Sequence, residues 1–93
     1  MKLSRARLIV EGIVQGVSYR WFVRDQAKRL GINGTVQNLP DGTVEIICEA
    51  DTEEKLKEFI ASISKGRFLG HKVDKVTRSD YTREIKPGFE ILF

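Results

Sequence analysis

The fold is decided by the stretch Gly12-Ile13-Val14-Gln15-Gly16-Val17-Ser18-Tyr19-Arg20, which joins two different hydrophobic patterns. Before it, apolar residues occupy alternate positions at Ala6, Leu8 and Val10, which is typical of a strand with one buried face. After it, apolar residues recur at helical spacing as far as Leu30. The stretch therefore predicts a strand, a short loop with two glycines, and a helix.

The start of this helix predicts an anion-binding site. The first N–H groups of a helix have no partner within it, and the positive end of the helix dipole lies behind them. Ser18 is available as an N-cap, and Arg20 stands in a first turn where the dipole favours Asp or Glu. A residue that breaks a local rule is a candidate for function. The same pattern also fits a plain structural junction with a surface arginine, so by itself it is weak evidence.

Length and composition favour one domain spanning residues 1–93. The 41% hydrophobic and 31% charged fractions are those of an ordinary globular chain. No apolar run approaches the roughly 20 residues of a membrane helix, and the N-terminus carries no apolar signal segment. We therefore expect a cytoplasmic monomer without membrane association. A net charge of +3 suits a small anionic ligand better than nucleic acid.

The rest of the chain completes a known pattern. The first helix is expected to end at Gly31. The later elements are a strand at 32–39, a turn at 39–42, a strand at 43–50, a helix from Asp51 to Gly66, a strand at 72–81 and a short strand at 89–93. This order predicts an α+β, ferredoxin-like βαββαβ sandwich, with two helices on one face of an antiparallel sheet and a short extra C-terminal strand.

This topology brings two distant residues to one edge of the sheet. The first helix returns the chain, so the first two strands run parallel with the third between them. Arg20 and Asn38 then lie at the same edge, separated laterally by about 10 Å, or two strand spacings. An Asn beside a Pro-Asp-Gly turn is more often a turn residue than a catalytic one. The topology nevertheless makes Arg20 and Asn38 a candidate pair.

Other reactive side chains predict structural roles. Cys48, the only cysteine, falls on the inward face of its strand and reads as core, and His71, the only histidine, reads as a solvated loop residue. The loop carries no activated nucleophile and no carboxylate cluster for a metal. Chemistry there must rely on positioning and fixed charge, which suits a reactive substrate such as a carboxylic–phosphoric anhydride.

Two motifs resemble those of the acylphosphatase family. The stretch at 12–20 is similar to the family's phosphate loop, G-x-V-Q-G-V-x-[F/Y]-R. The segment Gly34-Thr35-Val36-Gln37-Asn38-Leu39-Pro40-Asp41-Gly42-Thr43-Val44-Glu45 is similar to its second signature, G-x-V-x-N-x-x-D-G-x-V-E. The resemblance extends along nearly the whole chain, and the two motifs together are highly specific.

The resemblance implies hydrolysis of acyl phosphates to carboxylate and orthophosphate by in-line attack of water, without a metal or cofactor. Arg20 would bind the phosphate and Asn38 would position the water. The phosphate cradle would be formed by the backbone N–H groups of Gln15, Gly16, Val17, Ser18, Tyr19 and Arg20. Inorganic phosphate or sulfate would then compete with the substrate.

Two rival functions stay open at this stage. One is a non-catalytic anion-binding or regulatory domain of the same fold, which only an assay distinguishes from the enzyme. The other is an RNA-binding module with this topology, which stacks bases on aromatic residues of its central strands. Here those strands carry no such aromatics and present Glu45 and Glu49 outward, which argues against nucleic acid.

Overall fold

The elements follow the predicted order in the computed structural model, which describes residues 2–65 and 70–93. They are β1 (Ser4–Ile13), α1 (Tyr19–Leu30), β2 (Asn33–Asn38), β3 (Val44–Ala50), α2 (Glu53–Ser64), β4 (Lys72–Asp80) and β5 (Phe89–Leu92). The predicted βαββαβ order with an added final strand is therefore confirmed.

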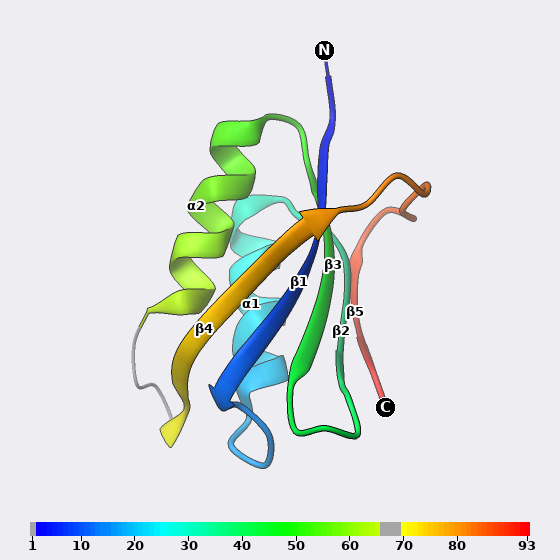
Figure 1. Cartoon of the computed structure of the whole chain (residues 1–93). Helices are drawn as coiled ribbons and strands as arrows, with labels where there is room; N and C mark the ends of the chain where they lie inside the picture. Colours follow the sequence, from blue (N-terminus) through cyan, green and yellow to red (C-terminus); the bar gives the residue numbers. More distant parts are fainter. Residues whose placement is uncertain (1, 66–69) are drawn as a thin grey trace.

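A single sheet with the order β4-β1-β3-β2-β5 organises the molecule. Both β1 and β2 are antiparallel to β3, which lies between them as predicted. The added strand β5 pairs parallel with β2, so the complete sheet is mixed. Figure 1 shows both helices on the same face of this sheet. The ferredoxin-like fold class is confirmed.

The core lies between the sheet and the helices, where the apolar alternation of the strands meets the apolar stripe of each helix. Its fully buried residues include Leu8 of β1, Ile46 of β3, Val23 of α1 and Phe59 of α2. Cys48 is buried in this core, and burial raises the pKa of its thiol to about 12. Cys48 is thus structural, as its strand position predicts.

The helix ends differ slightly from the sequence expectations. Gly31 ends α1 with a φ of 70°, in the left-handed region that glycine adopts without strain. The predicted start of α2 at Asp51 is wrong, because the cap is the extended Thr52, whose hydroxyl accepts the hydrogen bond from the Lys55 N–H, and the first helical residue is Glu53. The last helical residue is Ser64, and the predicted end at Gly66 lies outside the described residues.

A bidentate ion pair joins β4 to α2 on the surface. The Arg78 guanidinium donates to both Glu53 carboxylate oxygens, at 2.7 and 2.8 Å, and the Ser4 hydroxyl of β1 donates to the same carboxylate. Hydrogen bonds from Arg78 and then Ser4 lower the pKa of Glu53 to about 2. Three elements therefore meet at one carboxylate.

This ion pair predicts a small, pH-dependent stabilisation. Because the pKa of Glu53 is lower in the folded chain, its contribution is complete above the unfolded value of 4.5 and is lost as pH falls toward 2. Solvent screens the exposed pair, so Arg78→Ala should cost only about 0.5 kcal/mol at pH 7. Urea titrations at pH 7 and pH 2 test this, with Lys55→Ala as the matched surface control. An equal Arg78→Ala effect at both pH values would contradict the assignment.

Candidate active site

The loop at 14–18 and the hairpin between β2 and β3 lie at the same edge of the sheet, the lower edge in Figure 1. Between them is a cavity of about 160 Å³, lined by Val14, Gly16, Ser18, Tyr19, Arg20, Trp21 and Asn38. The cavity brings together Arg20 and Asn38, which are separated by one helix and one strand in the sequence. The topological expectation that they become neighbours is confirmed.

The loop owes its path to backbone conformations that most residues avoid. At its entry the register between β1 and β4 shifts after Glu11, with the extra residue Asp74 in β4, and a Cβ on Gly12 would lie 2.1 Å from the carbonyl oxygen of Lys72. Further on, Gly16 and Ser18 have φ values of 72° and 62°, whereas the φ of Val17 between them is not positive. Left-handed residues in a short loop can turn successive N–H groups toward one point, as in anion-binding concavities.

Ser18 precedes α1 but does not cap it with its side chain. The expectation that its hydroxyl caps the helix is wrong, because the residue adopts a left-handed conformation and makes no side-chain cap hydrogen bond. A cap residue normally has extended backbone, which aims its side chain at the first N–H groups. The N–H groups at the start of α1 are therefore not occupied by this hydroxyl. A left-handed non-glycine residue is strained, and such strain is concentrated at functional loops.

The Gln15 side chain fastens the loop to the hairpin. Its amide Nε2 donates to the carbonyl oxygens of Leu39 and Thr43, both at 2.8 Å. The turn is further ordered by Asp41, whose carboxylate accepts from the backbone N–H and the hydroxyl of Thr43. Gln15 thus sets the position of the loop relative to the strand that ends at Asn38, and its side chain does not line the cavity.

Arg20 is held from the far end of the chain. One guanidinium nitrogen donates to the Leu92 carbonyl oxygen at 2.8 Å, and the guanidinium carbon lies 4.8 Å from the centroid of the Phe93 ring. A guanidinium has five N–H donors, so this anchor leaves others available to a ligand. No local sequence signal indicates these two partners, because they approach Arg20 only through the pairing of β5 with β2.

Asn38, the last residue of β2, contributes the site's buried acceptor. Its Oδ1 atom is buried, and nothing in the part of the chain that the structure describes donates a hydrogen bond to it. An unsatisfied buried oxygen of this kind costs about 1–3 kcal/mol. A buried group of this kind is a candidate for binding a ligand or an ordered water.

Aromatic side chains pack together on the buried side of the first turn of α1. The buried Tyr19 ring lies edge-on to the His71 ring, with 5.0 Å between centroids, and Phe22 lies 4.8 Å from the same imidazole. The Tyr19 hydroxyl donates to the Ile63 carbonyl oxygen at 2.9 Å, and burial raises the pKa of this phenol. The expectation of a solvated His71 is wrong, because the residue is buried against these rings. Tyr19 can therefore offer the site only its backbone N–H.

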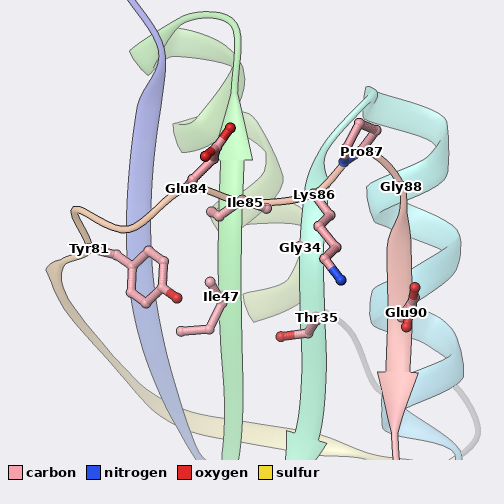
Figure 2. A pocket seen from close by; sticks show the side chains of 10 residues that line it. All are labelled: Gly34, Thr35, Ile47, Tyr81, Glu84, Ile85, Lys86, Pro87, Gly88 and Glu90. Carbon is pink, nitrogen blue, oxygen red and sulfur yellow. The ribbon is translucent and has the colours of Figure 1, made fainter.

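A larger cavity of about 250 Å³ lies elsewhere. Figure 2 shows the segment from Tyr81 to Gly88 crossing over the face of β3 and β2 that is opposite to the helices. The lining of this cavity includes Thr35 and Ile47 but neither Arg20 nor Asn38.

Across residues 2–65 and 70–93, no three His, Cys, Asp or Glu side chains form a group able to hold a metal ion. Among the same residues, no helix is long and apolar enough to cross a membrane.

Comparison with known proteins identifies the family. The acylphosphatase family model matches residues 6–91. The chain is 41% identical over 90 residues to an acylphosphatase of Thermococcus kodakarensis, which covers 97% of this chain and 93% of the relative. It is 50% identical over 84 residues to an acylphosphatase of Bacillus licheniformis, and this match covers 90% of this chain and 89% of the relative.

The fold comparison agrees with the sequence comparison. The crystal structure of acylphosphatase from Bacillus subtilis matches with a TM-score of 0.87 and 32% identity, covering 99% of this chain and 100% of that one. Sequence, fold and site geometry thus lead to one conclusion: the chain belongs to the acylphosphatase family, whose members are enzymes that hydrolyse acyl phosphates.

Proposed function

We propose that the cavity between the loop and the hairpin is the catalytic site for acyl phosphate hydrolysis. In this proposal, Arg20 and the backbone N–H groups of residues 15–20 bind the phosphoryl group, and Asn38 orients the attacking water. The observation that carries the proposal is the buried Oδ1 of Asn38, which has no hydrogen-bond partner among residues 2–65 and 70–93 and belongs to a residue that lines the same cavity as Arg20. Such an acceptor is suited to hold a water by one of its protons.

The proposed reaction is a single in-line displacement. The water oxygen attacks phosphorus, the bond from phosphorus to the bridging oxygen breaks, and the carboxylate leaves with the bonding electron pair. Arg20 and the loop N–H groups stabilise the charge on the equatorial oxygens. A phosphoryl oxygen of the substrate takes the water proton, since the described residues that line the cavity include no carboxylate or imidazole. This scheme uses positioning and fixed charge alone, without a metal or cofactor.

We further infer how the protein works in solution. Its 93 residues act as one domain and as a cytoplasmic monomer, with a small-molecule acyl phosphate as substrate. Inorganic phosphate and sulfate compete for the same cradle. On the open sheet face, Arg5 and Arg7 are paired with Glu49 and Glu45 at 2.7 Å. Because carboxylates neutralise these arginines, this face offers them little to the phosphates of a nucleic acid. This supports the inference that the protein binds no nucleic acid.

The decisive assay is hydrolysis of benzoyl phosphate with and without a chelator. We expect equal amounts of benzoate and orthophosphate, an unchanged rate in excess EDTA, and competitive inhibition by inorganic phosphate. Hydrolysis of p-nitrophenyl phosphate should be far slower, because a monoester has a poorer leaving group than an anhydride. Loss of activity in EDTA would refute the metal-free mechanism. Phosphate binding without turnover would instead support the non-catalytic anion-binding domain.

A further inference from the structure

The size of the site bears on where the acyl part of a substrate lies. A cavity of about 160 Å³ corresponds to about five water molecules, which is the scale of one phosphoryl group and its attacking water. With the phosphoryl group against Arg20 and Asn38, we place the acyl group toward the rim of the cavity. The surface that it meets there determines which acyl phosphates are preferred.

Two exposed aromatic residues contact the cavity or its arginine. Among the described residues, the exposed large hydrophobic side chains are Leu3, Ile13, Trp21 and Phe93. Trp21 is among the residues that line the cavity, and 45% of it is exposed, so it lies where the cavity meets the surface. Phe93 stacks on Arg20 and is 93% exposed. An exposed apolar side chain beside a ligand cavity is a candidate for contact with the ligand.

The indole of Trp21 is held in place from its own helix. The Arg24 guanidinium carbon lies 4.5 Å from the centroid of the Trp21 ring, one helical turn further along α1. This cation–π contact fixes the ring while leaving part of it exposed. An aromatic surface that is already ordered binds an apolar group with little loss of conformational entropy.

From these contacts we propose that Trp21 is a specificity-determining residue and that the enzyme prefers acyl phosphates with a flat, apolar acyl group. The inference rests on the function proposed above, since it places the phosphoryl group against Arg20 and Asn38. In that arrangement the acyl group leaves the cavity along the Trp21 indole, where an aromatic ring can stack. A small acetyl group is too short to cover the indole.

Kinetics on matched substrates test the proposal. We expect Trp21→Ala to lower kcat/KM for benzoyl phosphate about tenfold, while kcat/KM for acetyl phosphate changes less than about twofold. The ratio of the two effects cancels the different intrinsic reactivities of the substrates. Trp21→Phe should retain most of the preference because it keeps an aromatic face. Leu3→Ala, which removes an exposed apolar side chain away from the cavity, is the matched control and should change neither value.

A binding measurement needs no turnover. Trp21 is the only tryptophan of the chain, so all indole fluorescence reports on this one side chain. Phenacylphosphonate, a non-hydrolysable analogue with an aromatic acyl group, should reduce quenching of Trp21 by acrylamide about twofold. Acetonylphosphonate and inorganic phosphate should bind without this protection.

The outcomes separate the two proposals. If the parent hydrolyses both substrates and Trp21→Ala lowers both equally, or neither, the role of Trp21 is overturned and the catalytic site stands. If phenacylphosphonate binds without shielding the indole, the role of Trp21 is overturned in the same way. If the parent hydrolyses neither substrate, both proposals fail.

Discussion

Replacing Arg20 with alanine should lower kcat for benzoyl phosphate by about a thousandfold, which is the scale measured when a transition-state charge loses its fixed donors. Inhibition by inorganic phosphate should weaken in parallel, because the same guanidinium binds the product anion. Arg20→Lys should recover only a small part of the rate, since an ammonium group cannot reproduce the planar array of donors.

The arginine experiment has a matched control on the same helix. Arg29 lies in the last turn of α1, where its guanidinium bonds Gln26 on the surface, and Arg29→Ala should leave kcat unchanged. Arg20→Ala also removes the bond to the Leu92 carbonyl, which should cost about 1 kcal/mol of stability. Thermal unfolding of each variant separates this loss from the catalytic one. Turnover by folded Arg20→Ala at the parental rate would refute the site assignment.

Replacing Asn38 with alanine should separate catalysis from binding. We expect kcat to fall about a hundredfold, because the attacking water loses its orientation, while the inhibition constant for phosphate changes less than about threefold. The change removes a buried oxygen that has no partner among the described residues, so it should not lower the midpoint of thermal unfolding. Loss of activity without loss of stability is the expected signature.

The control for Asn38 lies at the other end of the same strand. The Asn33 side chain accepts from the Gly88 N–H at 2.9 Å and donates to Glu49 at 3.2 Å, so it ties β2 to its neighbours. Asn33→Ala should therefore reduce stability and leave kcat near the parental value. A similar fall in kcat for both variants would mean that Asn38 acts only through the structure of the strand.

Local patterns predicted most of the fold. The helical spacing before Gly31 and the Leu39-Pro40-Asp41-Gly42 turn are short-range signals, and the structure confirms both, with Gly42 at a φ of 92°. Once the order of elements is known, the topology puts Arg20 and Asn38 at one edge, where they share a cavity. This much follows from sequence because each step depends on neighbouring residues or on strand order.

Side-chain contacts between distant segments could not be predicted from local patterns and the order of elements. The predicted exposure of His71 was wrong because its loop position gives no sign of the Tyr19 and Phe22 rings that bury it. Likewise, Glu53 is four residues before Lys57, but its carboxylate pairs with Arg78 of β4. Helical spacing predicts only partners on the same helix, whereas the bidentate partner comes from a strand 25 positions away.

The hydrogen bond from Arg20 to Leu92 also bears on the order of folding, because it joins residues 72 positions apart. Closing a loop of that length costs chain entropy, so such a contact forms only after the intervening strands have paired. The loop at 14–18 and the helix that follows it are local and can form early. Arg20 gains its contact with Leu92 only when the last strand has docked. If Arg20 acts as proposed above, the onset of activity during refolding should report docking of the last strand rather than collapse of the core.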